Sequence, residues 1–254
     1  MKEMDRLVKI METLRAPGGC PWDAEQDHKS LVASLIEETY ELAEAIGQDD
    51  GPAMAEELGD LLLQVVFHSI IGKEEGRFCL SDVIDQLCQK LVYRHPHVFG
   101  DVRVADASEV TRNWDRLKNG EKGKSQRITI SDGIPKQLPA LLYAHKLQTR
   151  AGRAGFDWPD APSVMEKIRE ETDELQNALD AGDPDAAADE IGDLIFSAVN
   201  LARKMGIDPE AAVRRVNDRF ANRFRRIEQA AAEKGLSVSD MPMTEKERIW
   251  QQAK

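Results

Sequence analysis

The 254-residue chain carries 34 Lys and Arg residues against 46 Asp and Glu residues, for a formal net charge of −12. This acidity argues against general binding of nucleic acid or of an anionic membrane, because both need clustered basic residues. Hydrophobic residues make up 41% of the sequence and charged residues 31%, an ordinary composition for a soluble protein that can bury sizeable cores.

Cysteine usage and hydropathy indicate a cytoplasmic protein. The three cysteines, Cys20, Cys79 and Cys88, form no C-x-x-C pair, and an odd number without a disulfide framework fits a reducing compartment. The first eleven residues are charged and lack the apolar centre of a signal peptide. The longest apolar tract, 61–71, is shorter than the ~20 residues that span a bilayer. We therefore expect a cytoplasmic protein with no membrane segment.

In the first half of the chain, apolar residues recur at helical spacing. A helix is predicted over 3–15 and ends before Pro17, and a loop that carries Trp22 follows at 20–27. Pro96 is predicted to break the helical pattern later in this half. Further helices are predicted over 30–46, 53–74, 81–93 and 107–118.

Residues 119–137 are polar and rich in glycine and proline, which is typical of a linker between domains. After this segment the order of predicted elements repeats: a helix is followed by a loop at 152–162, which carries Trp158. Helices are predicted over 139–151, 163–181, 184–205, 209–234 and 244–253. Because no convincing strand occurs, we predict an all-α protein of two helical bundles: an N-terminal domain (1–118), a linker (119–137) and a C-terminal domain (138–254).

One acidic pattern occurs twice. Residues 37–41 read E-E-T-Y-E and are followed by E-L-G-D at 57–60, while residues 170–174 read E-E-T-D-E and are followed by E-I-G-D at 190–193. Every position of the second copy lies 133 residues after its match, without a gap. A repeat of this length indicates one folding unit used twice.

Helical geometry predicts that the acidic residues of each copy converge. Around the helix at 163–181, Glu171 and Glu174 lie about 60° and 120° to one side of an apolar seam, and Glu190 and Asp193 flank the seam of the next helix. If the two helices pack antiparallel, four carboxylates meet, and a hard divalent cation relieves their repulsion. The simpler alternative is a solvated acidic face with ordinary salt bridges.

The two copies differ in their cations. The second copy has Lys167 before its acidic triplet, and Arg219 and Arg223 one turn apart on a later helix, which suit a polyphosphate. Ser34 and Val98 replace Lys167 and Arg223 in the first copy, whereas Arg94 matches Arg219. We therefore expect the C-terminal domain to be the main catalytic unit. The N-terminal metal set is compatible with metal binding, weak activity or a role in assembly; it comprises Glu38, Glu41, Glu57 and Asp60.

The tryptophans obey the repeat too, since Trp22 precedes Trp114 by 92 residues and Trp158 precedes Trp250 by the same number. Such residues are either repeated core anchors or platforms on which a nucleobase stacks.

The acidic motifs strongly resemble those of the MazG nucleoside triphosphate pyrophosphohydrolases. The resemblance covers E-E-x-x-E followed by E-x-G-D, the stretch 19–23 (G-C-P-W-D) and the final 250–252 (W-Q-Q), and it runs nearly end to end with two units in tandem. It implies the all-α NTP pyrophosphatase fold and hydrolysis of nucleoside triphosphates, ribo- and deoxyribo-, to monophosphate and pyrophosphate. It also implies homodimers or larger assemblies with sites near subunit interfaces.

Under this resemblance, Mg²⁺, with Mn²⁺ as a substitute, is held by Glu171, Glu174, Glu190 and Asp193. Glu170 or one of the metal ligands positions or deprotonates the attacking water, so these five acidic residues form the catalytic set. Substrate binding falls to Lys167, Glu170, Glu171, Arg219, Arg223 and Trp250. Stacking on Trp250 tolerates any base, which predicts broad nucleotide use.

Two other functions remain open from the sequence. One is a helical interaction or regulatory protein that binds metal without turnover, and the other is an enzyme that hydrolyses a different pyrophosphate compound. A ferritin-like di-iron site is disfavoured, because it needs Glu-x-x-His pairs and all five histidines precede residue 150.

Overall fold

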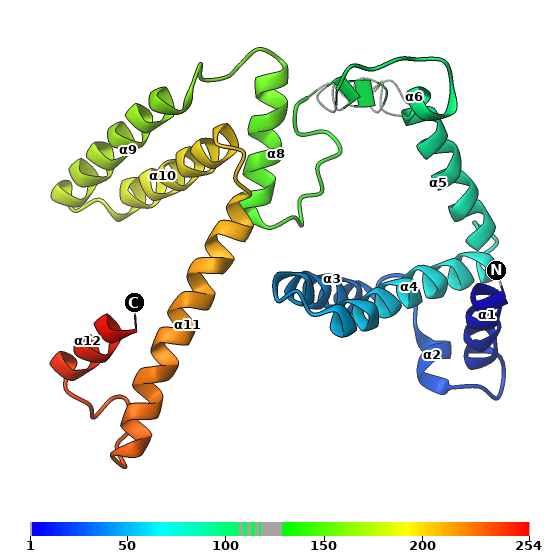
Figure 1. Cartoon of the computed structure of the whole chain (residues 1–254), viewed down its shortest axis with the longest axis horizontal. Coiled ribbons are helices and arrows are strands. Elements are labelled where there is room, and N and C mark those ends of the chain that lie inside the picture. Colours follow the sequence, from blue (N-terminus) through cyan, green and yellow to red (C-terminus); the bar gives the residue numbers. More distant parts are fainter. Residues whose placement is uncertain (1, 107–108, 111–112, 115–116, 118–128, 254) are drawn as a thin grey trace. The chain divides into compact units, whose positions relative to one another are not determined.

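The computed structural model describes residues 2–106, 109–110, 113–114, 117 and 129–253 (Figure 1). All the elements formed by these residues are helices, which confirms the predicted all-α class. The chain divides into two compact units, Met1–Ser125 and Gln126–Lys254, and each is described by itself. Within the described ranges, no helix is both long and apolar enough to cross a membrane.

The N-terminal unit is built on a helical hairpin. Helix α3 packs along α4, α1 packs against α4, and α5 follows α4 (Figure 1). A small core of Met11, Leu31, Val66, Phe67, Ile70 and Ile71 lies where α1 meets α4. The helices span Lys2–Arg15 (α1), Pro21–Glu25 (α2), Val32–Gly47 (α3), Gly51–Glu74 (α4), Leu80–Arg94 (α5) and Pro96–Phe99 (α6).

One segment of this unit differs from the sequence-based expectation, because the predicted loop at 20–27 contains the short helix α2. The predicted break at Pro96 is confirmed: α5 ends at Arg94, and Pro96 begins the separate short helix α6. Both helices begin at a proline, because the first turn of a helix leaves its N–H groups unpaired and so tolerates proline. Of the helix predicted at 107–118, residues 109–110, 113–114 and 117 are helical, and the others lie outside the described residues.

The C-terminal unit repeats the hairpin. Helix α9 packs along α10, and α10 also contacts α8 (Figure 1). Helix α11 contacts α8 and α10 and holds α12 through a second small core of Ile227, Ala231, Met241 and Ile249. The helices span Ala140–Arg153 (α8), Ala161–Ala181 (α9), Pro184–Lys204 (α10), Pro209–Glu233 (α11) and Met243–Gln252 (α12).

Aspartate caps set the start of the helices that carry the acidic motifs. The side chains of Asp50, Asp160 and Asp183 accept hydrogen bonds from backbone N–H groups in the first turns of α4, α9 and α10. A proline sits in the first turn of each of these helices, where its fixed φ suits the helix. The left-handed Gly182 (φ 65°) ends α9, so the chain turns directly into α10.

Several helices keep an apolar face exposed within each unit. Helix α5 has no buried residue, and large apolar side chains of α10 and α11 also face solvent. The exposed residues include Ile84, Leu87 and Leu91 on α5, Ile191 and Ile195 on α10, and Val213, Val216 and Phe220 on α11. Faces of this kind are normally covered by another protein surface.

Candidate functional site: two carboxylate clusters

Three carboxylates of the C-terminal unit converge between α9 and α10. Each of Glu171, Glu174 and Glu190 offers one oxygen, and these oxygens lie within 4.8 Å of one another. Glu171 is buried, with 4% of its surface exposed, whereas Glu174 is exposed. Asp193 lies exposed one turn after Glu190 and falls outside this group. The fold therefore brings together three of the four carboxylates that helical geometry predicts to converge.

Glu171 lies in the helix interface itself, not at its edge. The apolar seam predicted for this helix consists of Ile168, Thr172, Leu175 and Leu179, but Leu179 is 57% exposed. The buried residues of α9 are instead Val164, Glu171 and Ala178, spaced seven apart. Two turns of a helix bring residues seven apart onto one line. Helix α9 therefore turns this line towards α10, the helix that it packs against.

Lys167 compensates part of the negative charge. Its Nζ lies 2.8 Å from Glu170 Oε1 and 2.8 Å from Glu171 Oε1. Hydrogen bonds to Glu170 and Glu171 raise the pKa of Lys167, so the ammonium form is strongly favoured. Desolvation raises the pKa of Glu174, as do its hydrogen bond with Glu171 and the charge of Glu190, while Lys167 opposes this rise.

The N-terminal unit contains the matching cluster, and none of the described residues of this unit supplies such a cation to it. Oxygens of Glu38 and Glu41 on α3 and Glu57 on α4 lie within 4.8 Å of one another. Glu57 Oε2 is buried and makes no hydrogen bond within the part of the chain that the structure describes. Desolvation, followed by repulsion from neighbouring carboxylates that include Asp60, raises the pKa values of Glu38 and Glu57. This cluster therefore favours a bound cation or proton.

The predicted phosphate and base ligands form a separate group on α11 and α12. The Arg223 guanidinium lies 5.6 Å from the Trp250 ring centroid, and Phe220 meets the same ring edge-to-face at 5.1 Å. Within the described part of the chain, α9 contacts α10 alone, and no interaction joins Arg219, Arg223 or Trp250 to the carboxylates. The substrate-binding roles of these three residues stay predictions.

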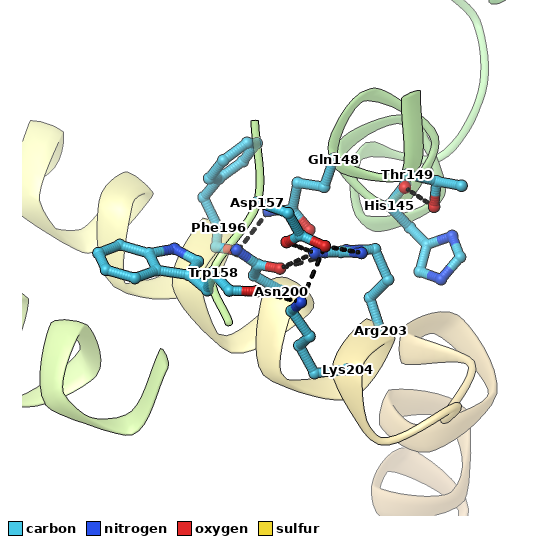
Figure 2. Close-up of polar contacts among 9 residues, drawn as sticks. All are labelled: His145, Gln148, Thr149, Asp157, Trp158, Phe196, Asn200, Arg203 and Lys204. Atoms are coloured by element: carbon cyan, nitrogen blue, oxygen red, sulfur yellow. Dashed lines mark hydrogen bonds and ion pairs between the residues drawn. The ribbon is translucent and has the colours of Figure 1, made fainter. Parts of the chain in front are cut away.

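A polar network beside α10 was not anticipated from the sequence (Figure 2). Asp157 forms ion pairs with Arg203 and Lys204, and Asn200 Oδ1 accepts a 2.7 Å hydrogen bond from Arg203 Nη2. The hydrogen bond from Arg203 is the main reason why the pKa of Asp157 falls to about 2. The network fixes the segment that carries Trp158 against the C-terminal half of α10.

The chemistry of both clusters suits a metal ion. Each offers only carboxylate oxygens, the ligands that hard divalent cations prefer, and each contains carboxyl groups whose pKa is raised by desolvation and by neighbouring carboxylates. The clusters could therefore hold a metal.

The chain is similar to known pyrophosphohydrolases over its whole length. The family model described as the MazG nucleotide pyrophosphohydrolase domain matches residues 26–99, and the model described as phosphoribosyl-ATP pyrophosphohydrolase matches residues 143–220. The nucleoside triphosphate pyrophosphohydrolase/pyrophosphatase MazG of Thermotoga maritima is 45% identical over 98% of this chain and 95% of its own. The nucleoside triphosphate pyrophosphohydrolase of Escherichia coli strain K12 is 41% identical over 100% of this chain and 98% of its own.

Proposed function

The chain belongs to the MazG family of nucleoside triphosphate pyrophosphohydrolases, and we propose that it hydrolyses ribo- and deoxyribonucleoside triphosphates to monophosphate and pyrophosphate at its C-terminal carboxylate cluster. One observation carries the choice of site: oxygens of Glu171, Glu174 and Glu190 converge within 4.8 Å beside a lysine.

We propose Mg²⁺ as the metal, with Mn²⁺ as a substitute, held by these three glutamates and by Asp193. A bound Mg²⁺ supplies Lewis-acid polarisation of phosphate oxygens and a lowered pKa for coordinated water. Asp193 lies one turn beyond Glu190 on α10, within reach of the same edge of the hairpin.

Two neighbouring side chains can compensate the charge of the substrate and position the attacking water. Lys167 already donates to Glu170 and Glu171, and its ammonium can offset charge on a triphosphate bound at the cluster. The Glu170 side chain is 58% exposed, so beside its contact with Lys167 it can orient or deprotonate a water at the open edge of the site.

We propose that a second copy of the chain completes the site. Arg219, Arg223 and Trp250 lie on helices that make no contact with α9, yet their chemistry suits a triphosphate and a base. Exposed apolar side chains on α10 and α11, among them Ile195 and Val216, offer the surface for a homodimer or a larger homo-oligomer.

The test is incubation of the protein with Mg²⁺ and each common ribo- and deoxyribonucleoside triphosphate, with the products resolved. Phosphoribosyl-ATP belongs in the same panel, because the family model of phosphoribosyl-ATP pyrophosphohydrolase matches residues 143–220 of the C-terminal unit. Monophosphate plus pyrophosphate, lost in Glu190→Gln, is the expected result. Absence of turnover, together with a metal-dependent rise in melting temperature, would instead favour a metal-binding interaction protein.

A further inference from the structure

Helix α11 carries a dense group of arginines in an otherwise acidic protein. Residues 214–226 contain six arginines and one aspartate, whereas the whole chain has a formal net charge of −12. Elsewhere in the C-terminal unit, cations such as Lys167, Arg203 and Lys204 are each paired with a carboxylate. Because the planar guanidinium group binds phosphate bidentately, this group of arginines indicates a ligand rich in phosphate.

Three of these arginines form one stripe along the helix. Arg215, Arg219 and Arg223 follow one another at intervals of four residues, so they lie within about 80° of the helix circumference. From the first Cα to the last, the stripe extends roughly 12 Å along the axis. Arg215 and Arg219 are exposed, and among the described residues neither has a hydrogen bond, an ion pair or a ring contact. Both guanidinium groups can therefore bind a ligand without breaking another interaction.

The stripe begins beside Trp250, to which we assign stacking of the base. The Arg223 guanidinium lies 5.6 Å from the Trp250 ring centroid. Helix α12, which carries this ring, packs on the C-terminal half of α11 through the second small core (Figure 1). Arg215 and Arg219 precede the part of α11 that this core covers. A phosphate chain that leaves a base stacked on Trp250 therefore meets the stripe at Arg223 and runs along it towards Arg215.

The stripe offers more cations than a triphosphate needs. In the proposed reaction the α-phosphate is attacked at the carboxylate cluster, which leaves the β- and γ-phosphates for α11. Arg223 and Arg219 are enough to pair with these two groups. Arg215 lies one further turn away, roughly 6 Å along the axis, where a triphosphate has no group left to bind. A fourth phosphate in the same chain would occupy this position.

We propose that, given the hydrolysis proposed above, the protein also hydrolyses nucleoside 5′-tetraphosphates and that Arg215 binds their terminal phosphate. The oxygen of the attacking water forms a bond to the α-phosphorus, and the bond from this phosphorus to the α–β bridging oxygen breaks. Inorganic triphosphate leaves with that oxygen, the nucleoside monophosphate remains, and the proton of the water is released. The longer chain carries more negative charge, which the third guanidinium offsets.

The test compares kcat/KM for adenosine 5′-tetraphosphate and for ATP in the presence of Mg²⁺. The wild-type protein should use the tetraphosphate at least as efficiently as ATP and release AMP and inorganic triphosphate. Arg215→Gln should lower kcat/KM for the tetraphosphate roughly tenfold, the effect of losing one charged hydrogen bond, and change the value for ATP by less than about twofold. Because Arg215 is exposed and outside both small cores, the melting temperature should stay unchanged.

Arg225→Gln is the matched control. Arg225 lies about 80° from Arg215 around the helix, on the side away from Arg223. Its Nη1 donates a 3.1 Å hydrogen bond to Asn222 Oδ1. The variant removes the same charge from the same helix, so it should leave the ratio of the two kcat/KM values at its wild-type level. An equal change of this ratio in both variants would show a general electrostatic effect and overturn the role of Arg215.

The remaining outcomes separate this inference from the proposed function. No hydrolysis of any nucleotide by the wild-type protein would overturn both. Hydrolysis of ATP without hydrolysis of the tetraphosphate would overturn the tetraphosphate activity alone, as would release of orthophosphate in place of inorganic triphosphate. A similar loss for both substrates in Arg215→Gln would show that Arg215 binds the triphosphate itself, and would overturn its assignment to a fourth phosphate.

Discussion

Lys167 Nζ lies 2.8 Å from Glu171 Oε1, so the buried carboxylate at the centre of the α9–α10 interface is paired with an ammonium one turn earlier on the same helix. The N-terminal unit has Ser34 at the corresponding position, and its glutamates have no such partner among the described residues. The two clusters therefore consist of glutamates at matching positions, but they differ in net charge.

Lys167→Met should weaken substrate binding more than metal binding. The variant removes a cation that can offset the triphosphate but adds no new ligand to the cluster. We expect KM for ATP to rise roughly 10- to 100-fold, the effect of losing a charged hydrogen bond. Calorimetric titration with Mg²⁺ should show unchanged or tighter binding. An unchanged KM would show that Lys167 serves only to hold Glu171.

Glu171→Gln should abolish turnover and leave the fold intact. The amide keeps the volume of the buried side chain but removes one negative charge, so the remaining carboxylates bind Mg²⁺ poorly. We expect kcat to fall by roughly 100-fold or more, with an unchanged circular dichroism spectrum. Glu38→Gln is the matched variant in the first unit and should retain most activity. Turnover at the wild-type rate in Glu171→Gln would contradict the site assignment.

The N-terminal unit should lose stability as pH falls below the ordinary histidine pKa. His28 Nδ1 and His68 Nδ1 lie 2.8 Å apart, and burial followed by the charge of His28 lowers the pKa of His68. Below the ordinary histidine pKa of about 6.5, the unfolded chain therefore binds more protons at His68 than the folded chain does. The free energy of unfolding consequently keeps its full value above about pH 6.5 and decreases as the pH falls below it. Melting temperatures from pH 8 to 5 should fall, and the fall should flatten in His68→Gln.

Asp157→Asn should destabilise the C-terminal unit. The Asp157 side chain is 25% exposed and pairs with Arg203 and Lys204, which lower its pKa to about 2. A lowered carboxyl pKa adds stability that is present above the unfolded value of 3.8 and is lost as pH falls towards 2. We expect a loss of about 2 kcal/mol at pH 7 in denaturant titrations. The difference between variant and wild type should vanish near pH 2, and a constant difference would contradict this origin.

Self-association should depend on the exposed apolar faces of α10 and α11. Ile195→Glu places a charge on a face that a second copy would cover, at a position 48% exposed within the chain. Sedimentation should show a homo-oligomer for the wild-type protein and a shift to monomer in the variant. A monodisperse wild-type monomer would contradict the proposed assembly.

Most of the helices were predictable because their signals are local. Asp183-Pro184 and Asp208-Pro209 combine a capping side chain with a proline in the first turn, and the acidic repeat follows from spacing alone. The burial of Glu171 was not predictable, because it depends on which line of α9 faces α10. The separation of Trp250 from the carboxylates also depends on tertiary packing, which periodicity does not encode.

The most direct test of the account compares the matched variants Glu190→Gln and Glu57→Gln by phosphorus NMR of the products from ATP and Mg²⁺. We predict AMP and pyrophosphate from the wild-type protein and from Glu57→Gln, and no product from Glu190→Gln. Equal turnover by the two variants, or release of orthophosphate in place of pyrophosphate, would contradict catalysis at the α9–α10 cluster.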